Sequence, residues 1–302
     1  MPSRRFCLAT GLNLSAASLF FSFGRLVSAA DSPAYVPELE KLAAAHKGKV
    51  AIAVKNLKTG ESWSMNADSP MPTASLIKFP VMIEAYRQVH EKKTSLDRMI
   101  TLKKEDMVPG SGILTYDFTP GSTLALKDAI RLMIKFSDNT ATNLVLDVIG
   151  LDATAKTMEA MGYPNTKIHS KVYKRETSVF PERSKQFGLG STTAGEMIRL
   201  CQALQEGKVV SPEASKEMFA HLRTCDDKDK FPKYLPYGTK LAFKTGSVNA
   251  SRTAAGIIET KAGPVALCVL TDQNEDQRWV PDNAGDVLCA KVAKVVFDYY
   301  SK

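Results

Sequence analysis

Apolar and polar residues alternate near both ends of the chain, and this pattern predicts strands there. Residues 49–55 form one predicted strand, and residues 61–65 form its hairpin partner across a turn that contains Gly60. Closer to the C-terminus the predicted strands are 241–245, 253–259 and 265–271. We therefore expect one antiparallel sheet that is built from both ends of the chain.

Between these two groups of strands, apolar residues recur at helical spacing. In the segment 126–135 the apolar face consists of Leu126, Ala129, Ile130, Met133 and Ile134. Helices are also predicted at 37–46, at 76–86 and, as an amphipathic C-terminal helix, at 287–299. The terminal helices are expected to cover the sheet.

This order of elements predicts an α/β fold of the α+β sandwich kind, with an antiparallel sheet and flanking helices. Residues 31–302 are expected to form a single domain. Within it, 31–70 and 223–302 would form an α/β lobe, and 71–222 an inserted all-helical lobe. The active site is expected between the two lobes.

Residues 1–30 have the pattern of an export signal. Arg4 and Arg5 precede an apolar stretch at 12–27, and Ser28-Ala29-Ala30 provides small residues for cleavage. The arginine pair approaches a twin-arginine signal. We expect a periplasmic or secreted protein with no stable membrane insertion after the signal is removed.

The composition is that of an ordinary soluble domain, with 44% hydrophobic and 24% charged residues. The formal charge is +8 but contains no basic run, which argues against a nucleic-acid partner and favours small anions. Cys7 lies in the signal, and the four remaining cysteines can pair in several ways. They are Cys201, Cys225, Cys268 and Cys289. None has the close spacing of a zinc site, so we expect neither a metal nor a cofactor.

The segment Ser75-Leu-Ile-Lys78 opens the predicted helix at 76–86. Residues three apart lie on one helix face, so the Lys78 amine is expected beside the Ser75 hydroxyl. Serine becomes a nucleophile when a neighbouring base takes its proton, and lysine can be that base once burial or a second cation lowers its pKa. The motif alone is common by chance. Two more motifs accompany it: Ser137-Asp138-Asn139 follows a predicted helix, and Lys244-Thr245-Gly246 ends a predicted strand.

In this order and these contexts, the three motifs resemble those of class A serine β-lactamases, from about residue 35 to the end. The resemblance implies that Ser75 attacks the lactam carbonyl, that Lys78 takes or relays its proton, and that Ser137 passes a proton to the departing nitrogen. It implies an oxyanion hole from the backbone N–H groups of Ser75 and Ser247. The substrate-binding residues it implies are Asn139, Lys244, Thr245, Ser247 and Arg252.

One expected feature of the family is missing. Class A enzymes position the deacylating water with a glutamate and, four residues later, an asparagine, on a loop that here spans 162–192; this loop contains no such pair. Counting forward from Gly162 puts Val172 at the glutamate's position, whereas counting back from Thr192 puts Ser178 there. Glu176 is our candidate for the base, and Glu182 is the other nearby carboxylate.

We therefore predict a monomeric serine β-lactamase that hydrolyses a small-molecule β-lactam through an acyl-enzyme at Ser75. Two alternatives stay open. One is a penicillin-binding protein or related sensor that is acylated at Ser75 and deacylates slowly. The other is a D-Ala-D-Ala peptidase or esterase on the same scaffold.

Overall fold

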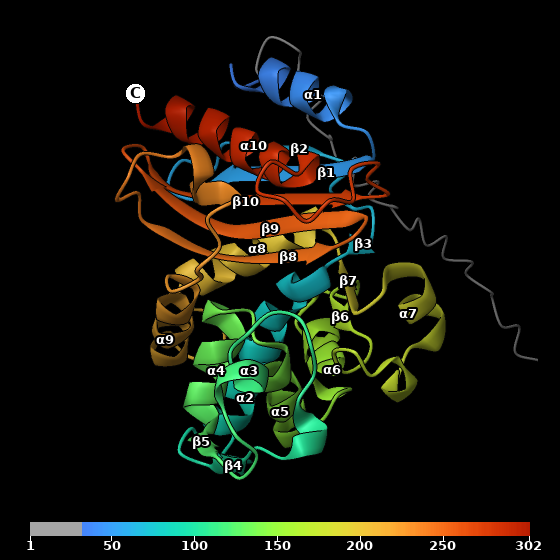
Figure 1. Ribbon diagram of the computed structural model, residues 1–302. Helices are drawn as coiled ribbons and strands as arrows, with labels where there is room; N and C mark the ends of the chain where they lie inside the picture. Colours follow the sequence, from blue (N-terminus) through green and yellow to red (C-terminus); the bar gives the residue numbers. More distant parts are fainter. Residues whose placement is uncertain (1–31) are drawn as a thin grey trace, which may run out of the picture. The chain divides into compact units, whose positions relative to one another are not determined.

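The computed structural model describes residues 32–302 and confirms the predicted sheet (Figure 1). The predicted hairpin is β1 (Lys49–Asn56) and β2 (Ser62–Met65), and the C-terminal strands are β8 (Leu241–Val248), β9 (Ser251–Thr260) and β10 (Gly263–Asp272). The strand order is β2-β1-β10-β9-β8, and every neighbouring pair is antiparallel. Strands from the two ends of the chain therefore meet as β1 and β10 inside the sheet. The predicted signal peptide lies outside the described residues.

Helices cover both faces of the sheet. α10 (Ala284–Tyr300) packs on β9 and β10, and α1 (Val36–Ala45) packs against α10. α8 (Ala194–Gln205) packs on the opposite face of the sheet (Figure 1). β1 is buried on both faces because its side chains alternate between two cores. Ile52 belongs to the core beneath α1 and α10, and Ala53 belongs to the core on the other side.

The second part of the fold is helical. It is drawn mainly in green and yellow in Figure 1 and follows the first two strands in the chain. Its helices are α2 (Lys78–His90), α3 (Leu114–Asp117), α4 (Leu126–Lys135), α5 (Asn139–Ile149), α6 (Ala153–Ala160), α7 (Pro181–Phe187) and α9 (Pro212–Leu222). The face predicted for the segment 126–135 is confirmed, because its five apolar side chains are buried in α4.

Several very short strands were not predicted, because two or three residues are too few to show a period. β4 (Met99–Thr101) pairs with β5 (Thr123–Ala125). β7 (Gly190–Thr192) lies between β3 (Met71–Pro72) and β6 (Lys167–Ile168). The second of these small sheets attaches the loop 162–192 to the segment that leads into Ser75.

Residues 33–302 group into one unit, and the finer division into two lobes stays a prediction. α8 falls inside 71–222 but packs on the sheet. The cysteines of the described part are free thiols, and only Cys225 among them is not fully buried. Within residues 32–302, no helix has the length and apolar character needed to cross a membrane.

β8 is an edge strand, and its backbone approaches the Ser75 segment closely at Gly246. A Cβ atom at Gly246 would lie 2.3 Å from the Thr73 carbonyl oxygen and 2.7 Å from the Ser75 nitrogen. The Thr253 hydroxyl, from the adjacent strand β9, donates to the same Thr73 carbonyl at 2.8 Å. Glycine at this position therefore allows the strand and the Ser75 segment to touch.

We expect Gly246→Ala to lower the free energy of unfolding by about 1–3 kcal/mol, because the added methyl group overpacks a backbone contact. Urea denaturation would measure this. Gly195→Ala is the control, since the nearest atom to its new Cβ is 3.2 Å away. Equal losses in the two variants would contradict this account of Gly246.

Candidate active site

Ser75 lies in a single 3₁₀ turn, η2 (Ala74–Ile77), that runs directly into α2. The Lys78 backbone N–H donates to the Ser75 carbonyl, so the two residues belong to one turn. Side chains at i and i+3 eclipse in a 3₁₀ helix, so this turn directs the side chains of Ser75 and Lys78 to the same side. The predicted position of Ser75 at the start of a helix is confirmed.

Lys78 is fully buried, and its amine contacts oxygen atoms of the Ser137-Asp138-Asn139 motif. Nζ donates to the Ser137 carbonyl at 2.6 Å and to Asn139 Oδ1 at 2.8 Å, and it lies 3.3 Å from Ser137 Oγ. Burial, and then the charge of Lys244, hold the pKa of Lys78 well below its usual value. A neutral amine has two N–H bonds and one lone pair. The two shorter contacts take its two N–H bonds, so the lone pair remains for a proton.

Lys244 reaches the same hydroxyl from the sheet side. It extends from β8, is 1% exposed, and donates from Nζ to Ser137 Oγ at 3.1 Å and to the Thr245 carbonyl at 2.9 Å. Burial lowers the pKa of this lysine too. Ser137 Oγ therefore lies between two amines. Because Lys244 donates to one of its lone pairs, its own proton is available to a group in the cavity.

Two residues beside these side chains have left-handed backbones. Ala74 has φ +45° and Ser137 has φ +52°. Such conformations cost of the order of 1–3 kcal/mol each and persist only where neighbouring groups impose them. Here the Ser137 carbonyl accepts from Lys78 and, at 2.7 Å, from Ser111 Oγ, and the carbonyl of Thr73 is held by β9.

Asp138 and Asn139 connect α5 to the loop at 108–113. Asp138 caps α5 by accepting from the Ala141 N–H at 2.8 Å, and its other oxygen accepts from the N–H groups of Ile113 and Leu114 at 2.7 and 2.9 Å. Asn139 Nδ2 donates to the Pro109 carbonyl at 2.9 Å. Asp138 therefore positions the loop at 108–113, while Ser137 and Asn139 contact Lys78.

Five of the nine predicted site residues line one cavity of about 880 Å³, a size typical of small-molecule sites. Its wall includes Ser75, Ser137, Asn139, Thr245 and Ser247. Lys78 and Lys244 lie behind this wall. The cavity therefore presents a nucleophile, a hydroxyl that can donate a proton, an amide and two further hydroxyls to one ligand.

The loop 162–192 contributes Val172 to the cavity wall, and not Glu176. Val172 is held by two hydrogen bonds with the side chain of Asn143, at 2.8 and 3.0 Å. Glu176 lies exposed in η4 (Arg175–Thr177), and it is not among the residues that line the cavity. Glu182 is also exposed and pairs with Lys185. The forward count, which puts Val172 at the glutamate's position, is the one that agrees with this geometry.

Arg252, which was predicted to assist substrate binding, is not among the residues that line the cavity. Its side chain is 1% exposed and donates to Asp286 at 3.4 Å and to the Arg278 carbonyl at 2.9 Å. It also donates to the carbonyl of Val248. A tight turn joins β8 to β9, and Arg252, just after it, is paired across the strands with Ser247. The Arg252 guanidinium group donates to the backbone carbonyls of this turn.

Two functional candidates had no motif to reveal them. Lys230 is 3% exposed and bridges Ser247 Oγ at 3.0 Å, Asp227 at 3.0 Å and Asp286 at 3.1 Å. Burial opposes the charged form of Lys230, but the two carboxylates raise its pKa above the usual value. Asp227 is the one carboxylate that lines the cavity within residues 32–302. Asp227 and Lys230 are three residues apart, and this spacing is the only feature of the sequence that suggests that they pair.

The chain is similar to proteins described as β-lactamases. A family model described as "Beta-lactamase enzyme family" matches residues 35–300. β-Lactamase VEB-1 of Pseudomonas aeruginosa is 20% identical over 94% of this chain and 95% of that protein.

Solved structures are also similar. The β-lactamase of Sphaerobacter thermophilus is 29% identical, with a TM-score of 0.76 over 87% of this chain and 95% of its own. An ancestral class A β-lactamase shares the fold, with a TM-score of 0.76 at 22% identity over 87% of this chain and 99% of its own.

We expect Lys244→Gln to move the pH inflection of the reaction at Ser75 upward. A nearby cation disfavours protonated Lys78, so its removal raises the pKa of Lys78, and the basic form appears only at higher pH. The measurement is the acylation rate against pH with a chromogenic cephalosporin. Exposed Lys240→Gln is the control. An inflection that stays in place, or moves down, would contradict the coupling of the two lysines.

Proposed function

This chain belongs to the beta-lactamase enzyme family, and we propose that it opens β-lactams by transferring their acyl group to Ser75. The observation that supports this most directly is the convergence of the Lys78 and Lys244 amines on Ser137 Oγ, at 3.3 and 3.1 Å, in the wall of the cavity that contains Ser75. This arrangement provides a buried base and a route for a proton.

In the proposed reaction, neutral Lys78 takes the proton of the Ser75 hydroxyl as Oγ attacks the lactam carbonyl carbon. The backbone N–H groups of Ser75 and Ser247 stabilise the oxyanion. The carbon–nitrogen bond then breaks, and the departing nitrogen takes a proton from Ser137. Ser137 regains a proton from protonated Lys78, its neighbour at 3.3 Å, and Lys78 is neutral again.

Asn139 would hold the side-chain amide of the substrate, and Thr245 and Ser247 would hold its carboxylate. The charge of Lys244 favours that anion, and Lys230 donates to Ser247 at 3.0 Å and would orient its hydroxyl. We assign no contact with the substrate to Arg252, since its donors bind protein oxygens. We propose that the protein acts as a monomer, and that it acts outside the cytoplasm because residues 1–30 have the pattern of an export signal.

We further propose that deacylation is slow. In a class A site, a carboxylate on the loop 162–192 would activate the water. Here the loop lines the cavity with Val172 and its neighbours and with no carboxylate, and Glu176 lies outside the lining. Asp227 also lines the cavity, but Lys230 holds its carboxylate at 3.0 Å and donates to Ser247 as well, so we do not assign it the role of base. This observation favours, as second candidate function, a penicillin-binding protein that retains its acyl group.

Ser75→Ala should form no covalent adduct with benzylpenicillin, because the hydroxyl is the acyl acceptor. Lys78→Ala should acylate about 10²–10⁴ times more slowly, which is the usual contribution of a general base. Intact mass spectrometry after mixing measures both. Exposed Ser62→Ala on β2 is the control. A penicillin adduct on Ser75→Ala at the rate of the wild type would rule out the proposed nucleophile.

Val172→Glu should shorten the lifetime of the acyl-enzyme, by about 10²-fold if the new carboxylate acts as a general base for water. Ser178→Glu is the matched control, because it adds the same charge at the alternative position, outside the cavity lining. The decay of the adduct mass after removal of free penicillin gives both lifetimes. The proposal for this loop fails if a folded Val172→Glu protein keeps its adduct as long as the wild type does.

A further inference from the structure

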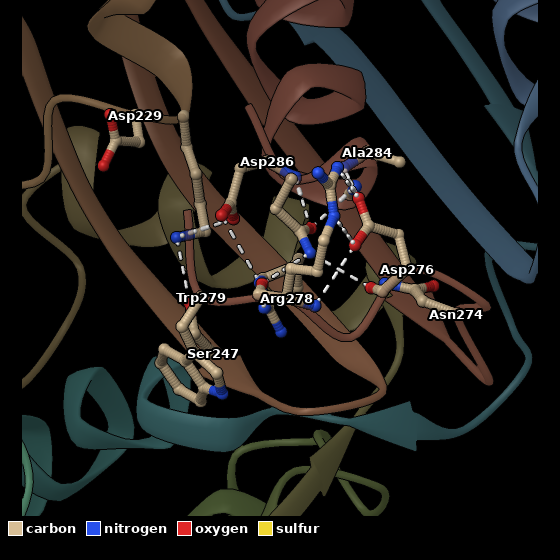
Figure 2. Close-up of polar contacts among 12 residues, drawn as sticks. Asp229, Ser247, Asn274, Asp276, Arg278, Trp279, Ala284 and Asp286 are labelled. Carbon is tan, nitrogen blue, oxygen red and sulfur yellow. Dashed lines mark hydrogen bonds and ion pairs between the residues drawn. The ribbon is translucent and has the colours of Figure 1, made fainter. Parts of the chain in front are cut away.

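Trp279 is a large aromatic side chain that the fold keeps exposed in the cavity wall. It is 66% exposed and lies in the loop between β10 and α10, and it lines the cavity together with Ser247 and Val248. Figure 2 labels Trp279 and Ser247 in the same part of the structure. A tryptophan left largely in water inside a ligand cavity is informative, because aromatic side chains gain most from being covered.

The buried arginine explains how the ring is held. The Arg252 guanidinium carbon lies 4.9 Å from the centre of the Trp279 ring, a cation–π contact. Arg252 is itself fixed by Asp286, and Asp286 also pairs with Lys230. On its edge, Trp279 Nε1 donates to Asn249 Oδ1 at 2.9 Å. With its N–H used, the indole offers its remaining surface as an apolar plane without a donor.

The loop that carries Trp279 is cross-linked by its own polar groups. Asn283 Nδ2 donates to the carbonyls of Asp276 and Arg278, at 3.0 and 2.9 Å. The Asp276 carboxylate accepts from the side chain of Arg278 and from the Ala284 N–H, each at 2.9 Å (Figure 2). A side chain on such a loop is ordered before a ligand arrives, so binding loses little conformational entropy.

We propose that Trp279 is a specificity-determining residue that stacks on a planar aromatic or heteroaromatic ring of the substrate. This inference rests on the proposed function, because that function orients the ligand. Thr245 and Ser247 would take the carboxylate, and Asn139, from α5, would take the acylamino side chain. Trp279 contacts Asn249 and Arg252, which lie at the β8–β9 turn that follows Ser247, so we place the ring it meets on the carboxylate-bearing half of the lactam. In a cephalosporin this is the substituent at C3.

Two cephalosporins with the same acylamino side chain test this, one with an acetoxymethyl and one with a heteroarylthiomethyl group at C3. We expect the wild type to acylate faster with the heteroaryl compound at low concentration. Trp279→Ala should reduce that preference by about 2- to 10-fold through a weaker apparent affinity, and Trp279→Phe should keep most of it. Tyr237→Ala, a fully exposed aromatic outside the cavity lining, is the control.

Fluorescence provides a second readout that does not need turnover. The chain has two tryptophans, Trp63 and Trp279, so in the double variant Trp63→Phe/Ser75→Ala the emission comes from Trp279 alone. We expect the heteroaryl compound to change this emission at lower concentrations than the acetoxymethyl compound does.

The outcomes separate the two proposals. If neither compound forms an adduct with the wild type, the proposed function fails, and the fluorescence titration still decides whether Trp279 binds the ring. If both compounds form adducts and Trp279→Ala slows them by the same factor, the stacking inference is wrong and the acyl-transfer proposal stands. Equal titration curves for the two compounds would likewise overturn the stacking.

Discussion

The site depends on the burial of two lysines against one hydroxyl group. Lys78 and Lys244 are 0% and 1% exposed, and within the described residues neither has a carboxylate within ion-pair distance. An isolated ammonium group is costly to bury, and a second one nearby adds to the cost. Both effects favour the neutral form of Lys78 and lower its pKa. Burial thereby turns an ordinary lysine into a base.

The fold has to hold this unfavourable arrangement together. Lys78 comes from the start of α2, Ser137 from the turn before α5, and Lys244 from the edge strand β8. The strand can approach because residue 246 has no side chain, and the carbonyls of Thr73 and Ser137 are fixed by hydrogen bonds. The left-handed backbones of Ala74 and Ser137 are where the packing imposes an unfavourable conformation on the chain.

A second group of buried charged residues differs from the first, because its cations are paired with carboxylates. Lys230 and Arg252 are buried, but both pair with Asp286, and Lys230 pairs with Asp227 as well. Their charges are neutralised within the protein, so this network serves to position Ser247 and Trp279. Within the described part of the chain, the lysines of the first group have no carboxylate partner, and burial lowers the pKa of both, which suits them to proton transfer. The paired cations of the second are suited to holding the wall of the cavity in place.

The sequence by itself determined the strands of the main sheet, the helices with a strong apolar period and the residues that converge at Ser137. The strands and helices follow from periodicity. The convergence was predicted from the resemblance of the three motifs to those of class A serine β-lactamases, because the motifs lie far apart in the chain. Only the tertiary structure decided the places of Arg252, Glu176, Val172, Lys230 and Trp279. Each depends on contacts between distant segments, such as Arg252 with Asp286 and Val172 with Asn143. No local pattern specifies whether a side chain turns toward a cavity or away from it, because that direction is set by the packing of elements far apart in the chain.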